Sequence, residues 1–93
     1  MLFRDYASPY PYSDDSRVII DPDEAPLEPL TGLAFLAACT SRIRLGTGIT
    51  IVPQRNPVYT AKQVADVDVL SDGRVDFGIG VGWLAEEFRA LDV

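Results

Sequence analysis

Two glycine-containing segments hold the residues with the clearest capacity to bind a ligand. The first runs from Gly46 to Thr50 and the second from Gly78 to Trp83, and each belongs to a short apolar stretch. Glycine weakens a β-strand unless the backbone, a ligand or an unusual torsion needs the space of a side chain. We therefore predict that the functional site lies where these two segments meet.

The residue types that the chain lacks restrict its chemistry. It has no histidine and a single cysteine, Cys39. The absence of histidine removes the usual general base and every Ser-His or Cys-His pair. A zinc or other soft-metal site is not expected, because histidine is absent and cysteine occurs only once. We interpret Cys39 as a small apolar helix residue in a reducing compartment.

Charge and hydropathy narrow the class of partner. The net charge of −6 offers no basic surface to the phosphates of a nucleic acid. No apolar run approaches the ~18 residues of a membrane span, and no basic-then-apolar leader is present. These features predict a cytoplasmic protein that binds neither nucleic acid nor membrane. The 93 residues can form at most one small domain.

A strand-helix-strand order connects the two glycine segments. We predict strands over about residues 43–52 and 75–80, joined by a crossover of roughly twenty residues that contains a helix. Such a connection makes the two strands parallel, and parallel strands are buried on both faces. Ligands of parallel α/β folds bind at the carboxyl ends of the strands, where both glycine segments lie.

Three helices are predicted, over about residues 28–40, 57–70 and 84–91. Asn56 is a favourable N-cap for the second helix, and Pro57 suits its first turn. Gly73 suits the left-handed position that follows a helix. Apolar residues at helical spacing predict the buried faces, formed by Leu30, Leu33, Ala34, Leu36 and Ala37 in the first helix and by Val58, Ala61, Val64, Ala65 and Val69 in the second.

Charged residues at the element ends receive structural interpretations. Asp68 and Arg74 bracket the turn between the second helix and the second strand, so we predict an ion pair across it. Glu86 and Glu87 fall in the first turn of a following helix, where a carboxylate complements the helix dipole. We favour that interpretation over acid-base catalysis.

Residues 1–26 form a separate region rich in acidic residues, proline and tyrosine, which predicts a long irregular loop without a core of its own. We interpret Tyr6, Tyr10 and Tyr12 as aromatic residues that dock this loop on the surface. A role in lining a binding site is the alternative.

The second glycine segment also permits a dinucleotide-binding interpretation. Residues 80–85 can be aligned with the pattern G-x-G-x-x-A that follows a strand and opens a helix. The acidic residue about twenty positions further on, which would bind the ribose, would lie beyond Val93. A Rossmann-type nicotinamide binder is therefore kept as a minor alternative.

The order and spacing of several motifs resemble the luciferase-like monooxygenase family of flavin- and deazaflavin-dependent oxidoreductases. The resemblance extends over about two thirds of the chain and is carried by segments 30–38, 40–48, 56–63, 68–74 and 78–88. It implies that residues 27–93 are part of a TIM (β/α)8 barrel, with its third and fourth strands and its second and third helices. A complete barrel takes about 250 residues.

The resemblance also implies a cofactor, FMN or the deazaflavin coenzyme F-420, at whose ring hydride is transferred in the oxidation of a small organic molecule. Positions that match the wall around the ring are Gly48, Ile49, Thr50, Gly80, Val81, Gly82 and Trp83. Many family members have a cis peptide bond where Gly48–Ile49 falls, so we predict a cis bond and a bulge there. No catalytic residue is assigned.

Some sugar-phosphate dehydrogenases of the family have a carboxylate where Trp83 falls, which argues against that substrate class and for an apolar wall. The full-length form is expected to be a homo-oligomer. The alternative function is a non-catalytic truncated paralogue that acts only through association.

Overall fold

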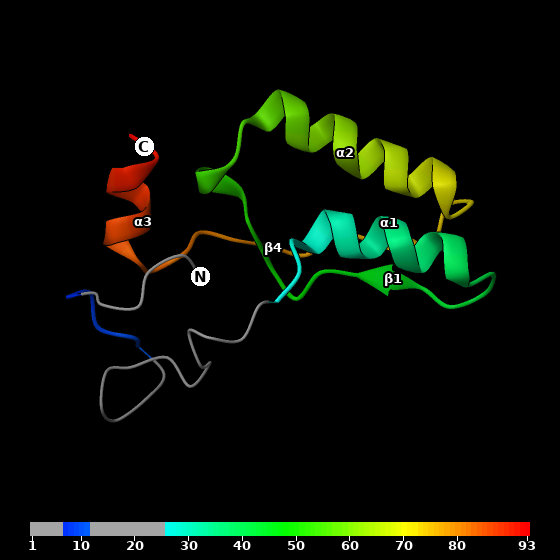
Figure 1. Ribbon diagram of the computed structural model, residues 1–93, viewed down its shortest axis with the longest axis horizontal. Coiled ribbons are helices and arrows are strands. Elements are labelled where there is room, and N and C mark those ends of the chain that lie inside the picture. Colours follow the sequence, from blue (N-terminus) through cyan, green and yellow to red (C-terminus); the bar gives the residue numbers. More distant parts are fainter. Residues whose placement is uncertain (1–6, 12–25) are drawn as a thin grey trace.

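The computed structural model describes residues 7–11 and 26–93. Most of the predicted loop region 1–26, with Tyr6 and Tyr12, lies outside these residues. The elements follow in the order α1 (Pro29–Cys39), β1 (Leu45–Gly46), β2 (Thr50–Ile51), the 3-10 turn η1 (Val52–Gln54), α2 (Pro57–Leu70), β3 (Val75–Asp76), β4 (Ile79–Gly80) and α3 (Ala85–Ala90). Helices α1 and α2 lie on one side of the strands (Figure 1).

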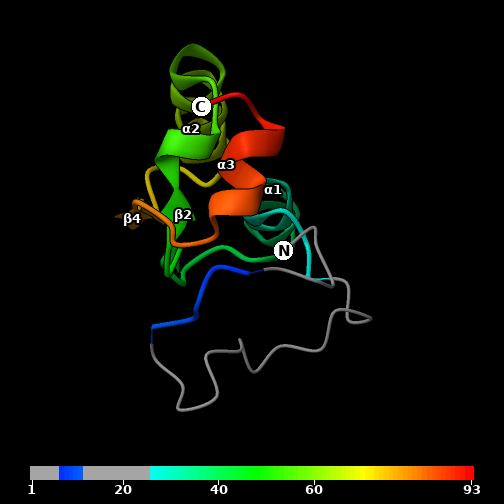
Figure 2. The same cartoon turned by 90° about the vertical axis from the view of Figure 1, so that its left-hand side faces the viewer.

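The strands pair in parallel, as predicted, but each predicted strand is interrupted. Strand β1 pairs with β3, with Gly46 opposite Asp76, and β2 pairs with β4, with Thr50 opposite Ile79. Figure 2 shows β2 and β4 next to each other. The predicted bounds, 43–52 and 75–80, are wider than the paired residues, and the pairing is broken between the two halves.

A bulge separates the two halves of the sheet. Four residue steps lead from Gly46 to Thr50, whereas three steps lead from Asp76 to Ile79, so the first strand contains one extra residue. The Gly48–Ile49 peptide bond within this stretch is cis. The predicted cis bond and the predicted bulge are both confirmed.

The hydroxyl group of Thr47 connects the strands at the bulge. It accepts a hydrogen bond from the backbone N–H of Gly78 at 2.9 Å and donates one to the Gly78 carbonyl at 2.7 Å. The same carbonyl accepts from the Thr50 N–H at 2.9 Å. Thr47 therefore replaces the backbone ladder where the extra residue interrupts it, a role that the sequence did not indicate.

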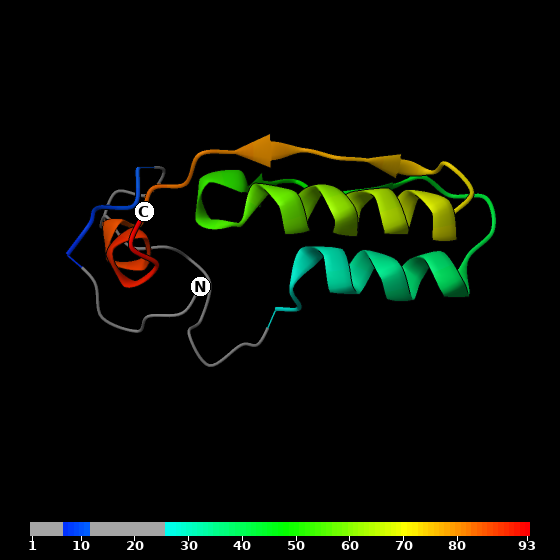
Figure 3. The same cartoon turned by 90° about the horizontal axis from the view of Figure 1, so that it is seen from above.

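The core lies between the two long helices and the first strand pair. Helices α1 and α2 run side by side over β1 and β3, as Figures 1 and 3 show. The buried side chains are Leu30, Leu33, Ala37, Leu45 and Val67, with Ala34, Val64, Val75 and Phe77 partly buried against them. Most of the predicted apolar face of α1 is thus confirmed, although Leu36 is 43% exposed.

The predicted buried face of α2 is wrong at every residue except Val64, which is partly buried. Val58 and Val69 are 76% and 79% exposed, and Ala61 and Ala65 are exposed as well. The buried residues of α2 are Thr60 and Val67. The physical reason is that α2 touches α1 on one side and the strands on another, so only the side chains directed at these neighbours lose contact with solvent. Helical spacing identifies a stripe but cannot state which neighbours will cover it.

The helix termini follow the predicted chemistry. Asn56 caps α2 by accepting hydrogen bonds from the N–H groups of Val58 and Tyr59. Gly73 is left-handed, with φ 78°, as predicted, and Asp72 before it is left-handed as well, with φ 58°. Among residues 7–11 and 26–93, none of the helices is both long and apolar enough to cross a membrane.

The predicted ion pair between Asp68 and Arg74 is wrong. The guanidinium group of Arg74 instead donates to the carbonyl oxygens of Ser71 at 2.6 Å and of Thr40 at 3.0 Å, and also to the carbonyls of Ala37 and Ile43 and the Thr40 hydroxyl. The last carbonyls of a helix have no intrahelical partner and carry partial negative charge. Arg74 lies between the carboxyl ends of α1 and α2, which explains its preference for carbonyls.

Candidate functional site

The fold brings the two predicted halves of the site together. Gly48, Ile49 and Thr50 lie at the bulge and in β2, and β2 pairs directly with β4, so that Ile51 is opposite Gly80. A side-chain Cβ at Gly80 would collide with Cδ1 of Ile49. The predicted cofactor-binding residues of the two strands are therefore neighbours at the carboxyl ends of parallel strands. Whether they bind a cofactor stays a prediction.

Packing inside the chain explains most of the glycines in the second segment. A Cβ at Gly78 would collide with the carbonyl oxygen of Thr47, and one at Gly82 would lie 2.8 Å from Cγ2 of Ile51. Gly82 is also left-handed, with φ 84°. In the first segment, Gly48 leaves open space, because a Cβ there would have no heavy atom within 4 Å; the same holds for Gly73, which lies away from the site in the turn after α2. Gly48 is accordingly the point where a ligand can come close to the backbone.

Thr50 supplies a buried polar atom to the site. Its side chain is 1% exposed, and its hydroxyl oxygen has no hydrogen-bond partner within the part of the chain that the structure describes. A buried polar group without a partner is costly. A hydroxyl group can donate to a carbonyl or accept from an N–H, and these are the groups at the edge of a flavin-type ring.

We predict that Thr50→Val does not destabilise the chain. The substitution removes an unpaired buried hydroxyl and keeps the branched shape, so the free energy of unfolding should stay unchanged or rise by up to about 1 kcal/mol. Urea denaturation followed by circular dichroism measures this. Thr60→Val is the matched control and should destabilise, because the Thr60 hydroxyl donates to the Asn56 carbonyl at 2.8 Å. A clear loss of stability in Thr50→Val would show that its hydroxyl has a partner within the chain.

The aromatic end of the site is formed by Trp83, which follows β4. The ring of Tyr10 lies against it with a centroid distance of 5.1 Å and an interplanar angle of 61°, an edge-to-face arrangement. Of the two interpretations of Tyr10, docking of the N-terminal region is thus observed. The structure also places this docked ring beside a predicted site residue.

Residues 7–11, here called the strap, are fastened to the first turn of α3. Oε1 of Glu86 accepts hydrogen bonds from the backbone N–H groups of Ala7 at 2.6 Å and Ser8 at 3.1 Å. The Ser8 hydroxyl accepts one from the N–H of Ala85 at 3.2 Å. The Ala7 N–H is the main cause that lowers the pKa of Glu86 to about 2. Sequence reasoning assigned Glu86 to the helix dipole and missed this contact, because its partners lie almost the whole chain away.

Glu87 differs from Glu86 in being buried, and its Oε2 accepts a hydrogen bond from Nε2 of Gln54 at 3.2 Å. This contact joins α3 to the turn η1. The predicted position of both glutamates in the first turn of α3 is confirmed.

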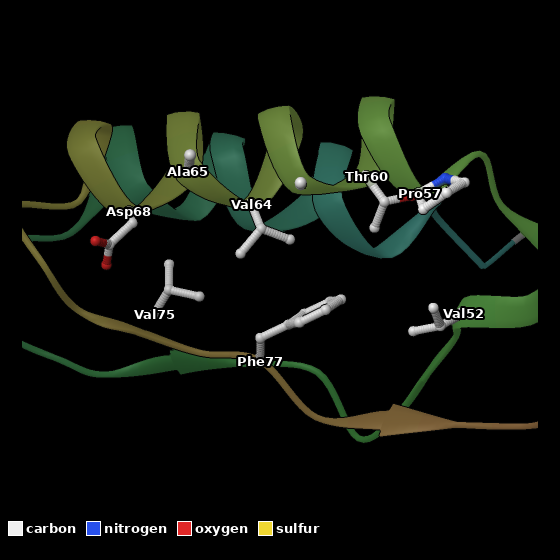
Figure 4. Close-up of a pocket in the computed structure, with 9 residues that line it drawn as sticks. Val52, Pro57, Thr60, Val64, Ala65, Asp68, Val75 and Phe77 are labelled. Carbon is white, nitrogen blue, oxygen red and sulfur yellow. The ribbon is translucent and has the colours of Figure 1, made fainter.

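A cavity of about 600 Å³ lies elsewhere, between α2 and the strands. Its lining is mainly apolar and consists of Val52, Pro57, Thr60, Ala61, Val64, Ala65, Asp68, Val75 and Phe77. Figure 4 shows Val64 of α2 directed toward Val75 and Phe77. None of the predicted cofactor-binding residues lines this cavity, which belongs to the layer between helix and sheet and not to the strand ends.

The polar groups at the carboxyl ends of the strands are suited to the uncharged edge of a flavin-type ring. Residues 48–53 and 79–84 contain no charged side chain. Gly48 leaves the backbone open to a ligand, and Thr50 offers one buried hydroxyl. Three or more metal-ligating side chains do not gather anywhere in residues 7–11 and 26–93.

Among protein families, the model described as luciferase-like monooxygenase matches residues 4–92. An uncharacterised protein of Mycobacterium tuberculosis is 37% identical over 78 residues, which cover 84% of this chain and 28% of that protein. The oxygenase component of the flavin-dependent trigonelline monooxygenase of Acinetobacter baylyi is 36% identical over 63 residues, which cover 68% of this chain and 18% of the relative.

Among solved structures, the crystal structure of the monooxygenase RslO1 from Streptomyces bottropensis superimposes with a TM-score of 0.67 at 39% identity. The match covers 71% of this chain and 20% of that one. The chain thus spans less than a third of the length of the relatives named here. These relatives do not favour the nicotinamide-binding alternative for residues 80–85. A family match that extends from residue 4 to residue 92 places this chain in the luciferase-like monooxygenase family.

Proposed function

We propose that this chain is part of a flavin- or deazaflavin-dependent oxidoreductase of the monooxygenase type, with FMN or coenzyme F-420 as the cofactor. Its paired strands would be the third and fourth of a TIM barrel, α1 the second helix and α2 the third. Family membership supports the enzyme class. The observation that carries the cofactor assignment is the bulge at Gly48, beside β4, with the buried unpaired hydroxyl of Thr50.

A bound flavin or deazaflavin would supply the redox chemistry, hydride transfer or activation of oxygen. The residues of this chain would hold and orient the ring. Gly48 would let the ring edge approach the backbone, and the Thr50 hydroxyl would hydrogen-bond to it. Ile49, Val81 and Trp83 would exclude water on the apolar side. The substrate would be a small organic molecule, as with the limonene 1,2-monooxygenase of Rhodococcus erythropolis, 38% identical over 61 residues.

The exposed apolar surface supports the proposal that the active unit is larger than this chain. Ile79 of β4 and Val81, which follows β4, are 62% and 75% exposed, and on the helices Phe35 and Tyr59 are 69% and 72% exposed. In a closed barrel such side chains would be covered by neighbouring strands and helices. We further propose that the complete protein is cytoplasmic and homo-oligomeric.

We predict that the isolated chain binds neither FMN nor coenzyme F-420 tightly, because the phosphate-holding loops of a TIM barrel follow its later strands. Titration with each cofactor, followed by its fluorescence, measures the dissociation constant. A sub-micromolar value for the 93-residue chain would contradict the proposal that it is one part of a larger barrel.

The complementary experiment restores the missing barrel. The 63 residues of this chain that match the oxygenase component of the flavin-dependent trigonelline monooxygenase replace the corresponding segment of that relative, and flavin binding by the chimera is compared with that of the unaltered oxygenase component. We expect the chimera to bind flavin and Thr50→Val in the chimera to weaken binding by roughly tenfold, the value of one hydrogen bond. Val58→Ala, on the exposed side of α2, is the control and should leave binding unchanged. A folded chimera that does not bind flavin would refute the cofactor proposal.

A further inference from the structure

The strap joins the two ends of the described chain at the aromatic end of the site. Its contacts to α3 connect residues 77 to 79 positions apart in the sequence. They are also reciprocal, because Glu86 accepts from the strap while Ser8 of the strap accepts from the first N–H of α3. A segment fixed at both Ala7 and Ser8 has a defined course two residues later, where Tyr10 meets Trp83.

The segment that contains Trp83 has no charged side chain in the sequence. Residues 79–84, which lead from β4 to α3, are all apolar or glycine. The nearest carboxylate along the chain belongs to Glu86, whose side chain is only 16% exposed. Its Oε1 accepts from the strap, and its Oε2 is buried without a hydrogen-bond partner among the described residues. A negatively charged group placed against Trp83 would therefore lose water without gaining a partner from residues 79–84, which is unfavourable.

We propose that the strap, fastened by Glu86, holds Tyr10 against Trp83 so that the two rings form a wall for an uncharged, apolar part of the substrate. This proposal rests on the proposed function, because the wall stands beside the strand ends assigned to the cofactor. Tyr10 and Trp83 would contact the substrate. Glu86 and Ser8 are positioning residues that act through the backbone of the strap.

The geometry of the wall can be measured without cofactor or substrate. Trp83 is the only tryptophan of the chain, so its indole N–H gives one resonance in a proton–nitrogen correlation spectrum. Tyr10→Ala removes the ring above it and should shift this resonance. Glu86→Ala should shift it in the same direction, because the N–H groups of Ala7 and Ser8 both lose their acceptor, Oε1 of Glu86. Tyr10→Phe keeps the ring and should leave the resonance close to its wild-type position.

The matched control is Arg89→Ala. Arg89 lies 3.7 Å from Glu86 but is 70% exposed, so its removal should leave the indole resonance in place. Glu86→Gln keeps an acceptor oxygen, so its indole resonance should lie closer to the wild-type position than that of Glu86→Ala. This variant also provides the measurement if Glu86→Ala fails to fold. An unmoved resonance in folded Tyr10→Ala would overturn the wall. An unmoved resonance in folded Glu86→Ala, with a shift in Tyr10→Ala, would overturn the positioning role of Glu86.

The substrate class is tested with two probes that share one ring, cyclohexanol and cyclohexanecarboxylate. We expect cyclohexanol to shift the indole resonance with at least about tenfold higher affinity, because the carboxylate would be desolvated without a partner. Tyr10→Ala should weaken the binding of cyclohexanol. Equal affinities for the two probes, or no response to cyclohexanol, would overturn the apolar assignment. None of these measurements uses flavin. A failure of the proposed wall is therefore distinguishable from a failure of the proposed flavin-binding function, which the chimera tests.

Discussion

Arg74→Ala should lower the free energy of unfolding by about 2–4 kcal/mol, the loss expected when several charge-assisted hydrogen bonds to mostly part-buried carbonyls are removed. The side chain is half-buried and makes five hydrogen bonds, to the carbonyl oxygens of Ala37, Thr40, Ile43 and Ser71 and to the Thr40 hydroxyl. Its removal would leave the carboxyl ends of α1 and α2 without these donors. The measurement is urea denaturation of both proteins, followed by circular dichroism.

Arg74→Lys should also destabilise, though less, because an ammonium group is a single point of donation and cannot reach carbonyls on two helices and a loop at once. The matched control is Arg44→Ala. Arg44 makes a two-point ion pair with Asp76, at 2.8 and 2.9 Å, but both side chains are 61% exposed. Pairs at that exposure contribute little. Equal losses in Arg74→Ala and Arg44→Ala would show that Arg74 does not bridge the helices.

Gly78→Ala should destabilise the chain by about 1–3 kcal/mol or more, because a methyl group is forced into a packed site. The added Cβ would collide with the carbonyl oxygen of Thr47, which is backbone and cannot rotate away. It would also disturb the two hydrogen bonds between the Thr47 hydroxyl and the backbone of Gly78. Small domains have only about 5–15 kcal/mol of total stability, so a large unfolded fraction is expected by circular dichroism.

Gly32→Ala is the matched control for this prediction. Gly32 lies inside α1, and a Cβ there would be 3.8 Å from Cβ of Leu27, an ordinary contact. Because alanine is a better helix former than glycine, this variant should gain about 0.5–1 kcal/mol. The two substitutions add the same methyl group, so opposite signs would separate the steric effect at Gly78 from a general effect of alanine. A tolerated Gly78→Ala would mean that β1 and β3 can move apart at the bulge.

The residues at the bulge show where sequence reasoning succeeded and where it stopped. The positions of Gly48 and Ile49 within the family resemblance predicted both the cis bond and the bulge, and the structure has them. The spacing also predicted the parallel pairing of the strands. It could not show that Thr47 takes over the hydrogen bonds of the interrupted ladder. That role depends on which backbone groups of the other strand lie opposite the hydroxyl.

What the sequence determined by itself is local. The N-cap of α2 at Asn56, the left-handed Gly73 after the helix, the β-branched strands and the parallel order all follow from chemistry between residues that are near in the chain. The tertiary structure decided the partners of Arg74 and Glu86. A neighbouring carboxylate made Asp68 the expected partner of Arg74, but two helix ends present more acceptors. Glu86 meets Ala7 because folding brings the strap to α3, and no periodicity or spacing encodes a contact across 79 positions.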